Sequence, residues 1–403
     1  MKKNTAEICP FHEYCGGCEY QGISYEKQLE KKQKRVDRLF SSICRPEKIL
    51  GMEDSLHYRN KVQVTFGKDD DNHMIMGNYA RDSHFIVPAD DCMICDEGAN
   101  EILSSIKKIL IKYRVSVFDE RALKGTIRHV LIRSTSLGEY MVVLVTGNTR
   151  LKNEKEIVRD ILRYNPQVTT ILQNYNGRHT SMILGEKTEI LYGRGYVVDE
   201  LMGCRFRISA SSFYQVNKRQ TEILYGKAVE YASLSGKETL IDAYCGTGTI
   251  GILMSRKAKK VYGVELNPRA VRDAKKNAED NHIANIEFIN DDAGNYMRAL
   301  ARKKMHIDTL IMDPPRSGSD ERFLSSVSAL APKRIVYVSC CPETLRDDMN
   351  YLLKNGYRAE KIQPVDMFPY TDHVETVCCL YHQKKDFISV PYEPKDASYL
   401  KQR

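Results

Sequence analysis

The stretch DAYCGTGTIG, residues 242–251, decides the fold class. Its three glycines fit the pattern G-x-G-x-x-G, and it joins the end of the short apolar run ETLIDAY to a helical pattern. Glu265 ends the next apolar run, 19 residues after Gly246. In a dinucleotide site such glycines let the backbone approach a phosphate, while the acid binds a ribose hydroxyl. Other nucleoside cofactors use the same layout, so the spacing does not distinguish NAD from S-adenosylmethionine.

The sequence around this stretch alternates apolar runs with helical patterns. A helix is predicted over residues 219–233, ahead of the first strand. The later predicted strands are VYGVEL, NIEFIN, HIDTLIMD, RIVYVSC and TVCCLYH. Such alternation implies an α/β fold with a doubly wound parallel sheet, in which ligands bind at the carboxyl ends of the strands.

The preceding region changes to an alternation of apolar and polar residues, as in KVQVTF and YMVVLVTG. This period of two predicts antiparallel strands, with helices interrupting near 97–114 and 153–163. The shifts in pattern predict four parts: a cysteine-rich segment with a basic helix at 1–56, a central α+β domain at 57–205, the Rossmann-like domain at 206–383, and a basic C-terminal tail at 384–403.

Residues 24–40, SYEKQLEKKQKRVDRLF, predict a helix with Ser24 as a possible N-cap. Its predicted apolar face consists of Leu29, Val36, Leu39 and Phe40. Its predicted basic face consists of Lys27, Lys31, Lys32, Lys34, Arg35 and Arg38. A solvated helix face is the simplest interpretation of that charge.

Composition excludes several classes of protein. The chain has 403 residues, enough for two or three domains at roughly 150 residues each. Hydrophobic residues at 42% and charged residues at 28% are typical of a globular protein, and no apolar run approaches the ~18 residues of a membrane span. No secretory signal is visible, so we expect a cytoplasmic protein. The 12 cysteines are then not structural disulfides, and they need another explanation.

Two acids follow later strands of the predicted sheet. Asp292 follows NIEFIN, where it is placed to accept a hydrogen bond from an adenine amine. Asp313 ends HIDTLIMD and precedes two prolines, which stiffen the loop because proline fixes its φ angle. A hydride-transfer site does not need this rigid acid. A methyltransferase that holds a planar base against a methyl group does.

Two further residues, candidates for a nucleophile and a base, lie at the same edge of the predicted sheet. Cys340 ends RIVYVSC, where nearby helix N-termini are expected to lower its pKa and make it a nucleophile. The alternative is a small buried hydrophobic residue. Glu375 enters the last apolar strand and is a candidate buried base with a raised pKa. His373 beside it is left without a role.

Together these blocks resemble the S-adenosylmethionine-dependent RNA uracil-C5 methyltransferase family. The matching blocks are FYQVN (213–217), DAYCGTGTIG (242–251), GVELN with Glu265, DPPR (313–316), VSCCPETL (338–345) and MFPYTDHVETV (367–377). They cover the C-terminal half of the chain in the family's order. The resemblance implies a cofactor site lined by Gln215, Tyr244, Glu265, Asp292 and Asp313, with Cys340 as nucleophile and Glu375 as base.

The implied reaction makes use of both residues. The Cys340 thiolate adds to C6 of uracil, which lets C5 attack the methyl group, and Glu375 then removes the C5 proton. The uridine must be unpaired or flipped out of a helix, because C6 is hidden in a stacked base. Cys341 stands where the family usually has asparagine. Cys340 directly follows Ser339, as the nucleophile usually does, so Cys340 remains the predicted nucleophile.

The N-terminal cysteines form a set of soft ligands. Cys9, Cys15 and Cys18 plus one distant cysteine suit zinc or an iron–sulfur cluster, and the spacing alone does not choose. CPFHEYCGGCEYQ resembles the motif of family members that act on ribosomal RNA. That resemblance implies a four-iron, four-sulfur cluster (4Fe-4S) with Cys92 as the fourth ligand, and Cys95 as the alternative.

The resemblance implies a cytoplasmic enzyme that methylates C5 of a uridine in 23S ribosomal RNA. Methylation of transfer RNA is the alternative within the class. An NAD-dependent oxidoreductase and a non-catalytic RNA-binding or iron–sulfur scaffold are the alternatives from other classes. RNA is the expected partner, with no membrane and no obligate protein partner. Eight residues precede Cys9, so the N-terminal β-barrel (TRAM) module of many relatives is expected to be absent. RNA binding is then expected to rest on the cluster region, the basic helix and the central strands.

Overall fold

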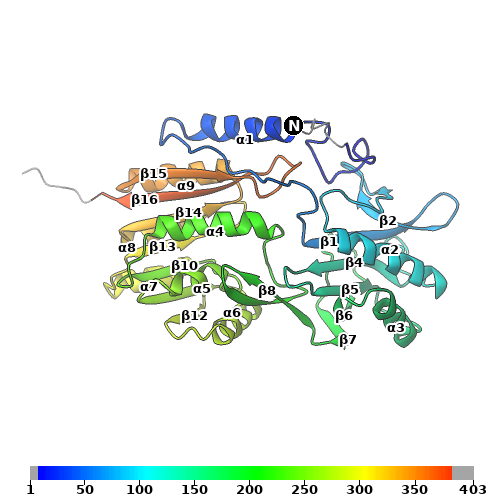
Figure 1. Ribbon diagram of the computed structural model, residues 1–403. Coiled ribbons are helices and arrows are strands. Elements are labelled where there is room, and N and C mark those ends of the chain that lie inside the picture. Colours follow the sequence, from blue (N-terminus) through cyan, green and yellow to red (C-terminus); the bar gives the residue numbers. More distant parts are fainter. Residues whose placement is uncertain (1–7, 384–403) are drawn as a thin grey trace, which may run out of the picture.

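The structure is a computed structural model that describes residues 8–383. The predicted basic tail at 384–403 lies outside the described residues. Two seven-stranded sheets and a separate hairpin form the framework, with one sheet on each side of the molecule (Figure 1). No helix among the described residues is long and apolar enough to cross a membrane.

The first sheet belongs to the central part of the chain and has the order β3-β2-β1-β4-β5-β6-β7. Its strands are β1 (Lys61–Lys68), β2 (Met74–Tyr79), β3 (Ile86–Val87), β4 (Ile127–Ser134), β5 (Tyr140–Thr146), β6 (Val168–Tyr175) and β7 (Lys187–Gly193). All neighbours are antiparallel except β5 and β6, which are parallel because α3 crosses between them. Helices α2 (Glu97–Lys112) and α3 (Glu154–Tyr164) cover one face of this sheet.

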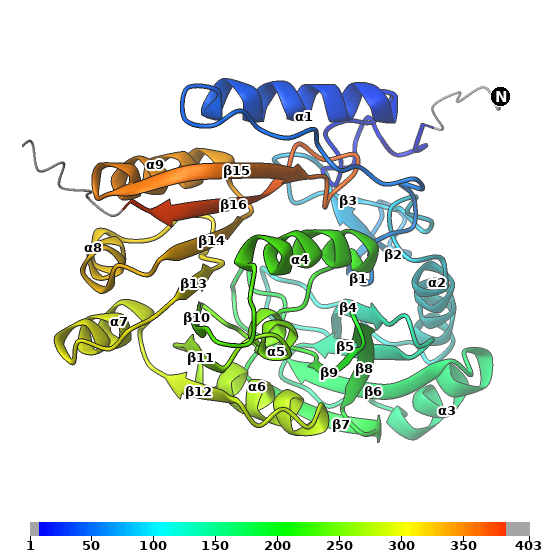
Figure 2. The same cartoon turned by 60° about the vertical axis from the view of Figure 1, so that its left-hand side comes forward.

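The second sheet has the order β12-β11-β10-β13-β14-β16-β15. Its strands are β10 (Thr239–Ala243), β11 (Lys260–Glu265), β12 (Ile286–Asn290), β13 (Thr309–Met312), β14 (Arg334–Ser339), β15 (Tyr357–Val365) and β16 (Glu375–His382). Its helices are α4 (Lys218–Ala232), α5 (Thr249–Ser255), α6 (Pro268–Asp280), α7 (Ala293–Arg302), α8 (Glu321–Leu330) and α9 (Pro342–Lys354). Helices α4 to α6 pack on one face, and α7 to α9 pack on the other, which is the doubly wound arrangement (Figure 2).

The predicted doubly wound sheet is parallel except at one edge. β16 is antiparallel to both of its neighbours, and the edge strand β15 was not predicted. The connection between these two strands, residues 366–374, is shorter than the dozen or more residues that a parallel crossover needs. The chain therefore turns back, and its last described strand enters the sheet between β14 and β15.

Helix α1 (Tyr25–Phe40) packs on the second sheet, on the same side as α9 (Figure 2). Val36 and Phe40 are fully buried in the core that also contains α7, α8 and α9. The predicted assignment of Lys32 to a solvated face was wrong, because Lys32 is only 1% exposed and lies on the buried face with Gln28. The remaining lysines at 27, 31 and 34 are exposed.

A hairpin joins the two halves. Strands β8 (Tyr196–Leu201) and β9 (Cys204–Ser209) pair only with each other in the described part of the chain. Their buried side chains share one core with β5 and β6 on one side and with α5 and α6 on the other. The largest apolar core therefore runs through both sheets, and this fixes the second sheet against the first.

Candidate active site and cysteine site

A small cavity lies at the carboxyl end of β10, where the glycine-rich stretch turns into α5. Gly248 has a φ of +82°, and a side chain there would also meet the ring of Phe288 at 2.7 Å. Gly251 lets α5 approach β10, since its peptide nitrogen donates to Asp242 Oδ2 at 2.7 Å. The cavity is lined by Phe213, Tyr214, Gln215, Thr221, Tyr225, Asp242, Tyr244, Cys245, Gly246, Thr247, Thr249, Ile250 and Asp313.

Asp242 is a buried acid of this lining to which sequence reasoning gave no role. It is 1% exposed, and burial raises its pKa to about 8. Its Oδ1 has no hydrogen-bond partner among residues 8–383. A buried carboxyl oxygen without a partner is costly, and it fits a ligand that brings a donor. An aspartate inside the apolar run LIDA was the available signal.

The structure brings together three of the five predicted cofactor residues. Gln215, Tyr244 and Asp313 line the cavity. Glu265 lies beside it, accepting from the peptide nitrogen of Gly246 at 3.1 Å. Asp292 is the N-cap of α7 and accepts from Asn295 N at 2.9 Å, so its Oδ1 is already engaged.

The enclosed part of the cavity measures about 40 Å³, which holds one or two waters. A ligand of nucleoside size therefore extends beyond it along the sheet edge. Tyr244 shapes this opening from a left-handed backbone conformation, with a φ of +61°. Such a conformation is uncommon for a residue with a side chain and occurs often at functional sites.

The predicted nucleophile and base lie at one end of neighbouring strands. Ser339 of β14 pairs with Thr376 of β16, so Cys340 and Glu375 follow at the same end of the sheet. Glu375 is 3% exposed, and burial together with the nearby charge of Asp313 raises its pKa to about 8. Desolvation likewise raises the pKa of Asp313 to about 7. The predicted raised pKa of the base agrees with this environment.

The pKa of the Cys340 thiol was expected to be lowered, and this direction was wrong. Burial raises its pKa to about 11, and the nearby carboxylates of Glu375 and Asp313 raise it further, while Arg316 opposes them. α9 does begin close by, at Pro342, but its N-terminus does not outweigh two acids and desolvation. At neutral pH the free protein therefore holds a thiol rather than a thiolate at this position.

Arg316 and His373 form a pair that sequence reasoning left without a role. Arg316 Nη2 donates to His373 Nε2 over 3.2 Å. Burial, and then the charge of Arg316, lowers the pKa of His373. Because an arginine side chain only donates, His373 Nε2 is the acceptor in this contact. The signal for Arg316 was its place in DPPR, directly after the loop that holds Asp313.

All the predicted cluster cysteines line a second cavity, of about 410 Å³. Cys9, Cys15, Cys18 and Cys92 are partly exposed there, and Cys95 is buried. The same cavity extends to Arg316 and His373. Among residues 8–383, no three Cys, His, Asp or Glu side chains lie close enough together to hold a metal ion. The thiols thus surround a common space without forming a single-ion site among these residues.

Comparison with known proteins identifies a family and several relatives that this chain resembles. The model of the tRNA (uracil-5-)-methyltransferase family matches residues 24–384. An uncharacterized RNA methyltransferase of Bacillus cereus is 42% identical over 383 residues, which are 94% of this chain and 83% of that protein. One from Clostridium tetani is 41% identical over 384 residues, with the same two shares.

A solved structure agrees with the sequence relatives. The Pyrococcus abyssi tRNA (uracil-54, C5)-methyltransferase in complex with S-adenosyl-L-homocysteine is 26% identical, with a TM-score of 0.76. The match covers 91% of this chain and 86% of that one. These matches exclude the NAD-dependent oxidoreductase alternative. The chain belongs to the tRNA (uracil-5-)-methyltransferase family and is an S-adenosylmethionine-dependent RNA methyltransferase of the uracil-C5 class.

Proposed function

We propose that this protein transfers a methyl group to C5 of a uridine in 23S ribosomal RNA through a covalent bond between Cys340 and C6 of the base. The observation that carries the chemistry is the strand register. It puts a thiol and a buried carboxyl at one end of β14 and β16, with Asp313 beside them. An acid and a nucleophile so close to a cofactor cavity suit base methylation.

The cavity at the end of β10 is the proposed cofactor site. Asp242 fits it, since its buried Oδ1 lacks a partner among the described residues. Gln215, Tyr244 and Asp313 line the same space, and Glu265 and Asp292 stand at the ends of the next two strands. When bound there, S-adenosylmethionine supplies an electrophilic methyl group.

Cys340 acts first in the proposed reaction. Its thiolate adds to C6, which forms a carbon–sulfur bond and moves the C5–C6 electron pair onto O4 as an enolate. C5 becomes nucleophilic as a result. Arg316 favours the thiolate, because its positive charge opposes the two carboxyls that raise the pKa of Cys340.

Glu375 completes the reaction. In its ionised form it takes the C5 proton after methylation, the electron pair restores the C5–C6 double bond, and Cys340 leaves as thiolate. With its pKa raised to about 8, Glu375 is a much stronger base than an exposed glutamate. The general-base role thus has a physical cause in burial beside Asp313.

The cysteine cavity is the proposed site of a 4Fe-4S cluster, held by Cys9, Cys15, Cys18 and Cys92, with Cys95 as the alternative fourth ligand. The donor set is all thiol, as such clusters require. All five thiols line one cavity of about 410 Å³, which has room for a polynuclear group. The cluster would brace the N-terminal segment against the loop that carries Cys92.

Iron content tests the cluster. We expect a brown anaerobic preparation with about four irons per chain, and loss of iron in Cys18→Ala but not in Cys44→Ala. Cys44 is a half-buried thiol outside the cavity. A colourless protein with one zinc would refute the cluster.

Ribosomal RNA is preferred as substrate because CPFHEYCGGCEYQ resembles the cluster motif of ribosomal-RNA members. Transfer RNA is the second candidate, since the Pyrococcus abyssi enzyme is named for it. A cytoplasmic location belongs to the proposal, because thiol ligands need a reducing compartment. Methyl transfer from labelled cofactor to purified ribosomal and transfer RNA, followed by mapping of the base, decides between them.

Trapping tests the mechanism. RNA containing 5-fluorouridine cannot lose a proton from C5, so with cofactor it should leave a covalent complex that survives denaturing electrophoresis. Cys340→Ala should abolish both the complex and methylation, whereas the matched variant Cys341→Ala should retain them. Glu375→Gln should stall with ordinary RNA attached. Absence of any complex with intact Cys340 would falsify the covalent route.

A further inference from the structure

The loop between β15 and β16, residues 366–374, is held mainly by residues from distant parts of the chain. It carries His373 and leads directly into Glu375. The Asp366 carbonyl accepts a hydrogen bond from Gln220 Nε2 at 2.8 Å, and the Met367 carbonyl accepts one from Asn217 Nδ2 at 2.9 Å. The Phe368 carbonyl accepts from Lys32 Nζ and the Pro369 carbonyl from the Tyr58 hydroxyl, both at 3.0 Å. The Tyr370 carbonyl accepts from Tyr20 N at 2.9 Å, and the Asp372 carbonyl from Arg35 Nη1 at 3.0 Å.

Lys32 is the centre of this arrangement. Its side chain and that of Asp366 are both fully buried, and they form an ion pair of 2.6 Å. The other Asp366 oxygen accepts from the Tyr25 hydroxyl at 2.8 Å. Lys32 thus binds the start of the loop twice, through the Asp366 carboxylate and through the Phe368 carbonyl.

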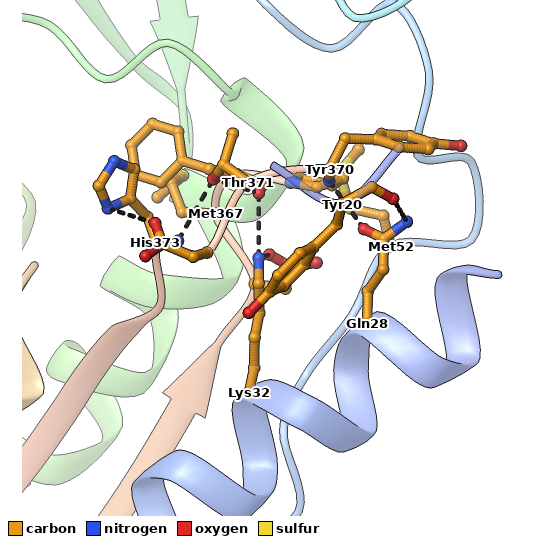
Figure 3. Close-up of polar contacts among 12 residues, drawn as sticks. Tyr20, Gln28, Lys32, Met52, Met367, Tyr370, Thr371 and His373 are labelled. Atoms are coloured by element: carbon orange, nitrogen blue, oxygen red, sulfur yellow. Dashed lines mark hydrogen bonds and ion pairs between the residues drawn. The ribbon is translucent and has the colours of Figure 1, made fainter. Parts of the chain in front are cut away.

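Gln28, one turn before Lys32 on α1, holds the middle of the loop. Its Oε1 accepts from Tyr370 N at 2.9 Å, and its Nε2 donates to Ile23 O at 2.9 Å. Figure 3 shows Gln28 and Lys32 pointing from the same face of α1 toward this loop. Tyr370 has a φ of +67°, a conformation that persists only where the surroundings enforce it.

Stability alone is a weak reason for such a pair. Taking a lysine and an aspartate out of water is expensive, and two apolar side chains of similar size often serve a core as well or better. A buried ion pair does fix one geometry, because in any other geometry each charged side chain would be buried without its partner. The geometry fixed here is that of the loop entering β16.

We infer that Lys32 is a positioning residue for proton removal. Through Asp366 and the Phe368 carbonyl it sets the loop, and thereby the direction in which Glu375 faces the base. The inference rests on the proposed function. Cys340 directly follows β14 and lies outside the loop, so the sulfur should still add to C6 when the loop is displaced.

Lys32→Met removes the positive charge and keeps most of the volume. With ordinary RNA and cofactor, we expect release of methylated RNA to slow by roughly 10- to 100-fold, the loss expected when a catalytic group is misplaced by about 1 Å. The covalent RNA–protein complex should accumulate, as in Glu375→Gln, while its rate of formation and the KM for RNA stay close to wild type. A role in folding alone would not produce this accumulation.

Lys112→Met is the matched control. It breaks a lysine–aspartate pair of the same length, 2.6 Å to Asp160, in the central part of the chain. Because that pair does not touch the loop, release should stay at the wild-type rate. Accumulation of the complex in this variant would overturn the inference.

Arg35→Met keeps the inference testable if Lys32→Met does not fold. The Arg35 side chain is 33% exposed, so its loss leaves no buried charge behind. It removes the donor to the Asp372 carbonyl, next to His373. We expect the same accumulation of complex, to a smaller degree.

The outcomes separate the two proposals. If wild type methylates no uridine and Glu375→Gln forms no complex, the proposed function fails and the inference falls with it. If wild type and Glu375→Gln behave as proposed, but folded Lys32→Met and Arg35→Met release RNA at the wild-type rate, only the inference is wrong. Loss of complex formation in Lys32→Met that still binds cofactor would also overturn it.

Discussion

Two carboxyls of the proposed site are held in environments that disfavour their charged forms. Asp242 and Glu375 are almost fully buried, and burial raises the pKa of each to about 8. A carboxyl with a raised pKa binds its proton more tightly in the folded state than in the unfolded state. Stability therefore falls as the pH rises from the ordinary value of 4.5 for Glu375 to about 8. The basicity that suits Glu375 to proton removal thus destabilises the fold.

Glu375→Gln should therefore stabilise the protein while stopping turnover. Glutamine resembles the protonated acid and does not ionise, so the gain should be roughly 1–2 kcal/mol larger at pH 8 than at pH 6, given about 1.4 kcal/mol per pKa unit. Urea unfolding at the two pH values measures it. Glu321→Gln, at the exposed start of α8, should show no such difference. An equal effect at both pH values would contradict the burial argument.

At the scale of the element, the sequence predicted the helices and strands that depend on the local pattern of apolar residues and glycines. Apolar runs and the glycines of 242–251 were enough to predict β10, α5 and the edge where the site lies. β15 was missed because YRAEKIQPV alternates poorly and contains Pro364, which is typical of an edge. The burial of Lys32 could not be read locally, because its partner Asp366 is 334 residues away. The contacts of the loop before Glu375 could not be predicted for the same reason.

α5 owes its position to Gly251. An added Cβ there would lie 2.8 Å from Asp242 Oδ2, so Gly251→Ala should push α5 away from β10 and weaken cofactor binding by about tenfold or more, a cost typical of overpacking. Calorimetric titration with S-adenosylmethionine measures it. Gly226→Ala in α4 is the control, because its Cβ meets nothing within 4 Å. That variant should bind normally and gain about 0.5–1 kcal/mol from helix propensity.

At the scale of the whole molecule, the cysteine cavity lies where three parts of the chain meet. The cysteine cavity is lined by the N-terminal segment, by Arg59 and Lys61 of the central part, and by Arg316 and His373 of the catalytic part. Since that cavity reaches Arg316 and His373, close to Glu375 in the chain, the cysteine-rich segment adjoins the proposed active site. We expect the exposed lysines of α1 to contact the phosphates of an RNA.

RNA affinity should accordingly fall with salt. Each phosphate neutralised on a single strand contributes about −0.7 to the slope of log K against log salt. Combined replacement of the exposed Lys27, Lys31 and Lys34 by glutamine should make the slope shallower by about 2 if each meets a phosphate. Replacing exposed lysines at 237, 257 and 259, which lie near the amino ends of β10 and β11, should leave it unchanged. Equal slopes in both triple variants would exclude α1 from the RNA interface.

The pairing of Lys32 with Asp366 has a consequence for how the enzyme is made. α1 leaves the ribosome early, and its buried lysine waits for a carboxylate 334 residues further on. At 5–20 residues per second that interval is roughly 20–70 seconds. β16, the strand that Glu375 begins, pairs with β14 next to Cys340, so the proposed nucleophile and base come together only once this strand has joined the sheet. Docking of α1 on the loop at residues 366–374 is therefore expected to be a late step in assembling the proposed active site.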